Sequence, residues 1–268
     1  IMQKKSSNPI KTFTIGFDVK DYDESKHAKA VADHLQTEHY SEDLRVNQLL
    51  DLMPNFLQNY DEPFFDSAAF PTMAVSRLAK EHVSVSITGD GGDELFGGYH
   101  YYRIASLLNP LLSLPDWMRS VTSTLSGIVP HHNFKLLSAA LKEKNSARAF
   151  AFSRSIAKDF RKVLAKNVME KTESFKDLFE KEANSFAKGI HASEEAMRLD
   201  MLFTLNDDYL QKTDVASMAF SLESRAPLLS REVVEWGARL PINWKLKSST
   251  NKYLLRKLAY RYVPESII

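Results

Sequence analysis

The chain has 268 residues, 44% of them hydrophobic, which is enough for one large domain or two small ones with a packed core. Its 35 basic residues balance 34 acidic ones, so the basic excess typical of a nucleic-acid groove is missing. No apolar run approaches the roughly 20 residues that span a bilayer, and the lack of cysteine excludes disulfides and a thiol nucleophile. By elimination we expect a cytoplasmic protein that binds neither nucleic acid nor membrane.

The first third of the chain alternates between strand and helix patterns. Alternating β-forming residues predict strands, and apolar residues at three- and four-residue spacing predict helices. The predicted elements are a strand at 11–18, a helix at 23–35, a short strand at 39–44, a helix at 46–60 with a break or kink at Pro54, a helix at 71–82 and a buried strand at 83–87. Strands separated by helices predict an α/β fold with a parallel sheet and helices on both of its faces.

Beyond about residue 104 the pattern becomes helical and strand-like runs nearly vanish. Segment 127–137 resembles a loop, and Ser230 and Thr250 are candidate caps for helices that begin just after them. The other helix-favouring segments are 147–167, 177–189 and 194–214. We therefore predict one domain in two parts, an α/β part at 1–104 and a helical part at 105–268 packed on it.

The stretch "SITGDGGDELFGGYHYYR" (86–103) holds five of the nine glycines within ten residues, together with Asp90, Asp93 and Glu94. Glycine permits positive φ and close approach of a ligand, and clustered acids repel unless a cation lies between them. The loop follows a predicted parallel strand, where such sheets bind ligands. Its glycine amides can form an anion nest, and Asp90 or Asp93 can reach Mg²⁺. The alternative is a glycine-rich turn in which Asp93 only caps a helix.

This stretch resembles the signature of the synthetase domain of glutamine-dependent asparagine synthetases, roughly S-G-[DE]-G-[GS]-D-E-[LV]-F-G-G-Y, with Thr88 in place of the first Ser. Other blocks resemble the same family in the same order across about residues 11–264. They are "TFTIGFDVKDYDESKHAKAVADHL", "DEPFFDSAAFPTMAVSRLAKEHVSV", "DDYLQKTDVASMAFSLESRAPLL" and "NKYLLRKLAYRYVP".

The resemblance implies an adenine nucleotide α-hydrolase-like fold, also called the ATP pyrophosphatase fold. It also implies a carbon–nitrogen ligase that uses ATP and Mg²⁺ to adenylate the side chain of aspartate. Ammonia, released from glutamine by a separate N-terminal glutaminase domain, then displaces AMP to give asparagine. Mg²⁺ offsets the charge that builds on pyrophosphate. The family's members often form homodimers.

Carried over position by position, the resemblance gives two catalytic residues. Asp90 matches the acidic position near the reacting carbonyl and the incoming ammonia. Lys252 matches a lysine that faces the ATP phosphates from the far side of the cleft, where its charge stabilises the transition state. On spacing alone, Lys252 would be a solvated helix lysine.

Five further residues match nucleotide- or metal-binding positions. The main chain of Ile15 matches an adenine contact, although Ile15 is equally a buried strand residue. Thr88 and Gly89 match positions that line the nucleotide and acyl-adenylate pocket. Asp93 matches the second acid of the loop and is the predicted metal ligand. Lys212 matches a basic position that lines the same cleft.

Residues 207–225 carry two further expectations. Asp208 or Tyr209 lies near an acid that some family members use for their substrate. Glu223 and Arg225 are predicted to form a structural ion pair, because a spacing of two suits neither one helix face nor a metal site.

The chain departs from the family pattern at several places. Val215 stands where the family usually has Arg, and Ser230 where it often has Asp. These departures keep two alternatives open. One is a related adenylating amidotransferase or a β-lactam-synthetase-like enzyme that acts on another carboxylate. The other is a non-catalytic scaffold that retains the nucleotide fold.

The family's phosphate loop, S-G-G-x-D-S, occurs nowhere in the chain. The chain therefore resembles a stretch of a longer polypeptide that begins after the first strand and phosphate loop of the sheet. We expect this stretch on its own to bind ATP weakly and to be unable to complete synthesis, because the amides that hold pyrophosphate are missing. Tight Mg-ATP binding by the 268-residue chain in a calorimetric titration would contradict this expectation.

Overall fold

The computed structural model describes residues 1–17, 23–129, 132–154, 165–169 and 174–267. The chain divides into two compact units that are interleaved along the sequence, which differs from the single division we predict at residue 104. Because the units comprise five segments, the chain passes between them four times, after residues 92, 203, 239 and 251. Unit 1 contains residues 1–92, 204–239 and 252–268, and unit 2 contains residues 93–203 and 240–251.

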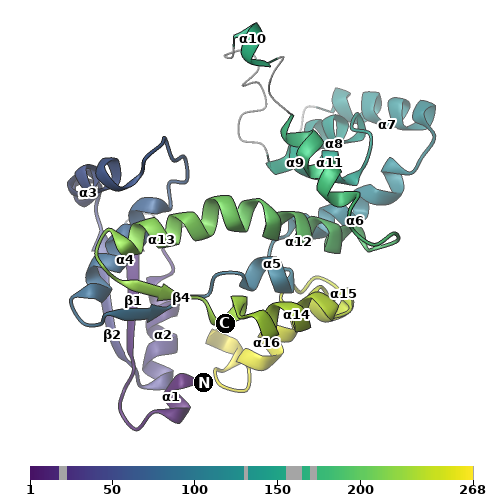
Figure 1. The fold of residues 1–268 in the computed structure, drawn as a ribbon. Helices are drawn as coiled ribbons and strands as arrows, with labels where there is room; N and C mark the ends of the chain where they lie inside the picture. Colours follow the sequence, from purple (N-terminus) through teal and green to yellow (C-terminus); the bar gives the residue numbers. More distant parts are fainter. Residues whose placement is uncertain (18–22, 130–131, 155–164, 170–173, 268) are drawn as a thin grey trace. The chain divides into compact units, whose positions relative to one another are not determined.

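Unit 1 begins with the alternation of strands and helices that the sequence predicts (Figure 1). A short helix precedes it, and α3 continues through Pro54. The elements are α1 (Met2–Lys5), β1 (Lys11–Phe17), α2 (Ser25–Leu35), β2 (Glu38–Leu44), α3 (Val46–Asn59), α4 (Ala69–Lys80) and β3 (Val85–Ile87).

The later segments of unit 1 add helices and one further strand. A π-helical turn at Leu205–Leu210 precedes the first of them, and 3₁₀ turns occupy Pro227–Leu229 and Glu265–Ile267. The remaining elements are α13 (Gln211–Met218), β4 (Glu223–Arg225), α14 (Arg231–Arg239) and α16 (Tyr253–Ala259).

In the part of the chain that the structure describes, the strands form two parallel pairs. β1 pairs with β2 from Lys11↔Glu38 to Phe17↔Leu44, and β3 pairs with β4 from Val85↔Glu223 to Ile87↔Arg225. The expected parallel pairing is therefore present, but the one sheet that we predict is two separate pairs, because no ladder joins β1 or β2 to β3 or β4.

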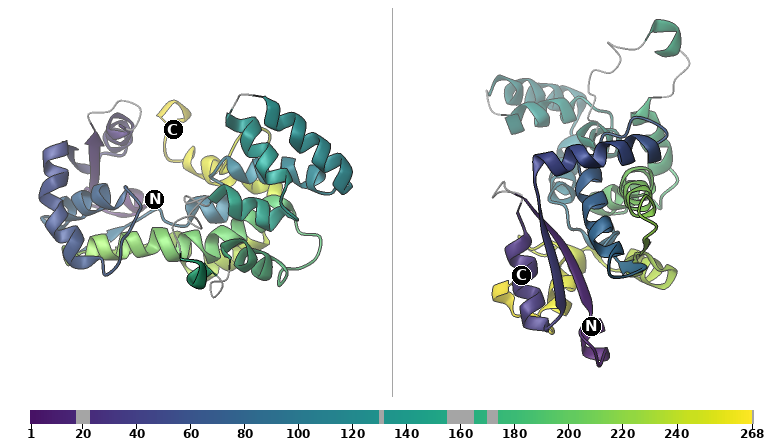
Figure 2. Two further views of the ribbon diagram at one scale, coloured as in Figure 1. Left: turned by 90° about the horizontal axis from the view of Figure 1, so that it is seen from above. Right: turned by 90° about the vertical axis from the view of Figure 1, so that its left-hand side faces the viewer.

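Helices cover both faces of the β1–β2 pair, with α2 on one side and α4 on the other (Figure 2, right). Ile15 and Phe17 of β1 pack against the core of unit 1, which α3, α4 and α13 supply. Its buried members are Leu44, Leu52, Tyr60, Ala69, Met73, Ala74 and Ala216.

Within its described residues, the regular elements of unit 2 are helices joined by turns and loops, with one isolated β-bridge between Lys247 and Thr250. Its core gathers aromatic and small residues of α6, α9, α11 and α12, and the fully buried Asp200 accepts hydrogen bonds of 2.7 Å from the hydroxyls of Tyr101 and Tyr102. The helices are α5 (Gly92–Phe96), which begins at the last residue of unit 1, α6 (Tyr101–Leu112), α7 (Asp116–Ile128), α8 (His132–Leu141), α9 (Ser146–Arg154), α10 (Lys166–Met169), α11 (Phe175–Ala183), α12 (Ala192–Leu202) and α15 (Ile242–Lys245).

Two local predictions are wrong. Segment 127–137 is mostly helical in its described residues, because α7 runs to Ile128 and α8 begins at His132. The strand at 83–87 is shorter than predicted and is not buried, since Val85 and Ile87 are 42% and 52% exposed. Part of the predicted helical segment 147–167, residues 155–164, lies outside the described residues. Among the helices that the structure describes, none is long and apolar enough to cross a bilayer.

Candidate active site

The loop that contains the clustered glycines and acids, here called the glycine-acid loop (Thr88 to Glu94), follows the carboxyl end of β3. The N–H of Thr88 donates to the carbonyl of Arg225 at 2.8 Å and so extends the β3–β4 ladder by one bond. The chain then turns, and the N–H of Gly92 donates to the carbonyl of Gly89 at 3.2 Å. The loop is therefore fixed at both ends by backbone bonds.

The three glycines of this turn differ in their surroundings. Gly91 has φ +80°, and a Cβ there would also overlap the side chain of Leu229. A Cβ on Gly92 would lie 3.1 Å from Leu228. Gly89 has no such neighbour, because a Cβ there would meet nothing within 4 Å. Packing among the described residues thus explains glycine at 91 and 92, whereas position 89 faces open space that a ligand can occupy.

The side chain of Asp90 is oriented by its neighbour in the loop. The hydroxyl of Thr88 donates to Oδ2 of Asp90 at 2.8 Å, and both residues are half-buried. This bond fixes the direction of the carboxylate and leaves its other oxygen for a further partner.

The two acids that follow have different surroundings. The predicted cap at Asp93 is wrong, because α5 begins at Gly92 and Asp93 lies inside its first turn. The carbonyl of Asp93 accepts the N–H of Gly98 at 2.8 Å. Asp93 belongs to unit 2 by its contacts, whereas Asp90 belongs to unit 1.

Glu94 is a structural residue rather than a ligand-facing acid. It is 2% exposed and accepts a hydrogen bond of 2.9 Å from the hydroxyl of Tyr99. Burial raises the pKa of this carboxyl above its ordinary value, because the charged form loses its hydration. Of the three acids in the stretch, Glu94 is therefore not available to a ligand.

Lys212, on α13, has its charge compensated. Its ammonium forms an ion pair of 2.5 Å with Asp66, and both side chains are largely buried. The ammonium also lies 4.9 Å from the ring centroid of Tyr209. Sequence reasoning missed Asp66, because nothing in the local pattern connects two residues 146 positions apart.

Lys252 is the residue before α16 and has left-handed backbone angles, φ 49° and ψ 37°. Positive φ is uncommon outside glycine, and such conformations cluster at functional sites. Thr250 is not the cap of this helix. It exchanges two backbone hydrogen bonds with Lys247 in an isolated bridge instead. The opposition of Lys252 and Asp90 across a nucleotide stays a prediction.

Ile15 is half-buried on β1, opposite Glu42 of β2. It lies beside a pocket of about 420 Å³ whose other walls include Thr14, Phe17 and residues of α2. Among the described residues β1 has a strand on one side only, so the backbone groups of its other edge have no ladder partner.

The structure brings no protein metal cage together. Within the described residues, no group of three or more His, Asp or Glu side chains is close enough to hold an ion.

Of the two expectations for residues 207–225, the structure confirms the ion pair, while a role of Asp208 or Tyr209 toward a substrate stays a prediction. Asp208 and Tyr209 lie in the π-helical turn, a rare local geometry that occurs often at functional sites. Glu223 and Arg225 form the predicted ion pair, at 2.7 Å. Val215, where the resemblance leads one to expect Arg, packs against the core of unit 1.

Comparison with known proteins decides the family, since residues 1–268 match the family described as asparagine synthase. The chain belongs to the asparagine synthase family. It is 30% identical to "Asparagine synthetase [glutamine-hydrolyzing] 1" of Bacillus subtilis over 97% of the chain and 41% of that protein. It is 31% identical to a putative asparagine synthetase of Mycobacterium bovis over 96% of the chain and 39% of that protein.

A putative asparagine synthetase of Methanocaldococcus jannaschii is 35% identical over 78% of the chain and 40% of its own length. The chain thus spans about two-fifths of the length of the asparagine synthetases it matches. The resemblance carried by the glycine-acid loop and the later blocks is confirmed at the level of the family.

Substitution of the loop glycines tests the structural account of the turn. We expect Gly91→Ala to lower the free energy of unfolding by about 1–2 kcal/mol or more, because it combines left-handed strain with a clash. Gly89→Ala should change it by less than about 0.5 kcal/mol, because its Cβ meets open space. Urea unfolding followed by tryptophan fluorescence measures both, and equal destabilisation by the two variants would contradict this account.

The burial of Glu94 predicts a pH dependence of stability. Because its pKa is raised in the folded state, the wild type loses stability as the pH rises from about 4.5, the ordinary value, through the folded pKa. Glu94→Gln removes this loss, so the unfolding free energy of the variant relative to wild type should increase over that range. Denaturant titrations at a series of pH values test this, with the exposed Glu62→Gln as the matched control. A difference that does not vary with pH for Glu94→Gln would show the prediction to be wrong.

Proposed function

We propose that this chain is the synthetase part of an enzyme that makes asparagine from aspartate, ammonia and ATP, releasing AMP and pyrophosphate. Membership of the asparagine synthase family and similarity to glutamine-hydrolysing asparagine synthetases support the reaction class. The ammonia would come from glutamine in a separate N-terminal glutaminase domain, and the enzyme would act as a homodimer in the cytoplasm.

The observation that carries the proposal is the loop at the end of β3. It combines an open position at Gly89 with a carboxylate, Asp90, whose direction is set by the hydroxyl of Thr88. Ligands of α/β folds bind beyond the carboxyl ends of parallel strands, which is where this loop lies. A turn that served only packing would not need glycine at position 89.

The proposed fold is that of the adenine nucleotide α-hydrolases. We assign adenine to the main chain of Ile15, which lines the pocket of about 420 Å³. Such a volume lies within the range of small-molecule sites. Thr88 and Gly89 would then line the pocket for the acyl-adenylate.

The chemistry follows two steps. A carboxylate oxygen of aspartate attacks the α-phosphorus of ATP, and pyrophosphate leaves with the electrons of the broken P–O bond. Ammonia then attacks the acyl carbon, loses a proton, and AMP leaves as the amide forms. Asp90, near the acyl carbon, would orient the ammonia and accept its proton. Lys252 would stabilise the negative charge that develops on the phosphates during the first step.

Magnesium is the expected cofactor, and Asp93 is its proposed protein ligand. When bound, Mg²⁺ offsets the negative charge on pyrophosphate. Lys212 is assigned to the nucleotide-binding part of the site. Because its ammonium is already paired with Asp66, it offers less positive charge to the phosphates of ATP than a lysine without an ion pair would.

A second candidate is a relative that adenylates a different carboxylate. The observation that favours it is Val215, a partly buried apolar residue that packs against the core of unit 1 at a position where the resemblance leads one to expect Arg. A missing guanidinium removes a bidentate partner for a carboxylate substrate. Measuring AMP release with a panel of carboxylic acids separates the two candidates.

We expect Asp90→Asn to lower aspartate-dependent AMP and asparagine formation by about 10²–10³-fold in the protein that contains this chain, because it loses a group at the reacting carbonyl. Thr88→Val should cause a smaller loss, since Asp90 keeps its charge but loses its orienting bond. Thr88→Ser retains the hydroxyl and should restore most of the activity.

The matched control is Asp33→Asn, which changes an exposed carboxylate of α2. Chromatography of adenine nucleotides and amino acids gives the rates. Wild-type activity in Asp90→Asn, or equal loss in Thr88→Val and Thr88→Ser, would remove this loop from the reaction. If another carboxylic acid supports AMP release and aspartate does not, that acid takes the place of aspartate as the proposed substrate.

A further inference from the structure

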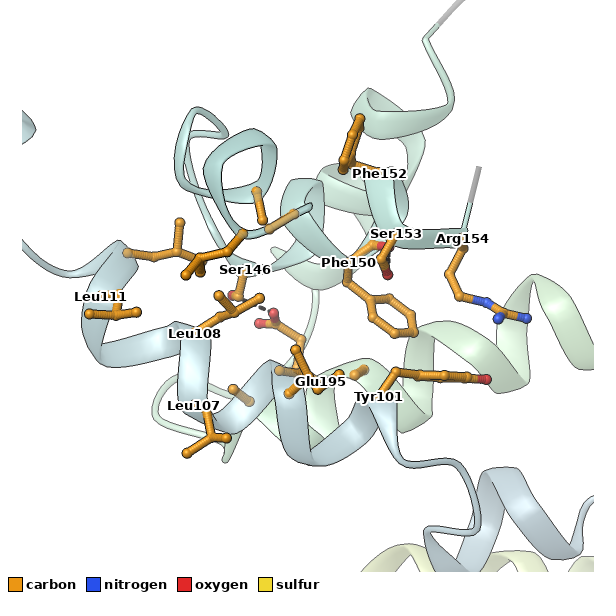
Figure 3. Close-up of a pocket in the computed structure, with 18 of the residues that line it drawn as sticks. Tyr101, Leu107, Leu108, Leu111, Ser146, Phe150, Phe152, Ser153, Arg154 and Glu195 are labelled. Atoms are coloured by element: carbon orange, nitrogen blue, oxygen red, sulfur yellow. Dashed lines mark hydrogen bonds between the residues drawn. The ribbon is translucent and has the colours of Figure 1, made fainter. Parts of the chain in front are cut away.

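Unit 2 contains a second pocket, of about 750 Å³, that the proposed reaction does not use. It lies among α6, α8, α9 and the start of α12, and every residue that lines it belongs to unit 2 (Figure 3). Its volume is typical of a site for a small organic molecule.

The walls of this pocket are predominantly apolar. α6 contributes leucines and smaller residues along its length, including Ile104, Leu108 and Leu111. Phe150 of α9 closes one end beside Tyr101 (Figure 3). α6 lines the pocket from Tyr101 to Leu112, and its 12 residues span roughly 18 Å at 1.5 Å per residue, so an elongated apolar chain can lie along this helix.

One charged side chain of this pocket forms no ion pair with any residue that the structure describes. Glu195 of α12 is half-buried and accepts a hydrogen bond of 2.5 Å from the hydroxyl of Ser146, which Figure 3 shows as a dashed line. None of the ion pairs among the described residues includes Glu195. The other charged residue of the lining, Arg154, lies 3.4 Å from Asp200, so its charge is already compensated.

A half-buried carboxylate against apolar walls is costly unless a cation compensates it. The hydroxyl of Ser146 supplies a hydrogen bond but no charge. The carboxylate of Glu195 could therefore be paired by a bound cation, and the apolar walls beside it could bind a hydrocarbon chain.

We propose that this pocket binds an amphipathic amine, with its ammonium on the carboxylate of Glu195 and its apolar chain along α6. The alkyl chain of the amine replaces water beside the leucines of α6, and each methylene group that is buried tightens binding roughly fourfold. The ammonium completes the pair that Glu195 lacks. The proposal does not depend on the proposed reaction, since no residue of the glycine-acid loop lines this pocket.

The test is calorimetric titration of the 268-residue chain with butylamine, hexylamine and octylamine, each below its aggregation concentration. We expect affinity to increase roughly 15-fold with each pair of methylene groups, since each one contributes about fourfold. Octylamine should bind at least about tenfold more tightly than octanol, which lacks the charge, or octanoate, which reverses it.

Glu195→Gln keeps an acceptor for Ser146 and removes the charge, so it should abolish the preference for octylamine over octanol. Glu194→Gln is the matched control, because this neighbouring carboxylate does not line the pocket. Ala105→Leu fills part of the pocket volume and should lower the binding affinity for octylamine and for octanol by a similar factor. Circular dichroism and thermal unfolding show that each variant is folded.

The proposal is overturned by tighter binding of octanoate than of octylamine, which would make the pocket a site for anions at Arg154. It is also overturned if the amine preference survives in Glu195→Gln, or if none of the three amines binds to the folded wild-type chain. Equal loss of octylamine binding in Glu194→Gln and Glu195→Gln would show only a general attraction to negative charge, and would equally reject the site.

Discussion

The left-handed turn at Gly91 is the constraint on which the candidate active site depends. A side chain there would combine an unfavourable φ with overlap of Leu229, so only glycine permits the chain to reverse directly after β3. Backbone bonds to Arg225 on one side and between Gly89 and Gly92 on the other fix the turn. Asp90 and the open face of Gly89 are therefore presented by a rigid backbone, which is what a site for a reactive acyl-adenylate requires.

Much of this arrangement could be predicted from the sequence, because its signals are local. Periodic apolar residues located β1, β2 and the helices α2 to α4 to within a few residues. The glycine-acid loop was recognisable by composition, and its place after a strand followed from the same pattern. The spacing of Glu223 and Arg225 was enough to identify a structural ion pair.

What the sequence could not supply depends on contacts between distant residues. β4 is three polar or charged residues, Glu223–Arg225, and becomes a strand only because β3 is available to pair with it. Asp66 and Lys212 compensate each other across 146 residues without any local pattern. Composition alone did not separate the acids of the loop. Asp90 lies before α5 and accepts a bond from Thr88, whereas Glu94 lies within α5 and is buried with the hydroxyl of Tyr99.

The interleaving of the two units has a practical consequence for protein engineering. Neither unit is one continuous stretch, so no single cleavage or truncation point releases either of them intact. To produce unit 1 alone, its three segments would have to be joined by two new linkers. A circular permutation instead keeps all four natural connections between the two units. Two of these crossings fall at Gly92–Asp93 and Asn251–Lys252, so a new terminus or linker there would alter residues assigned to the reaction.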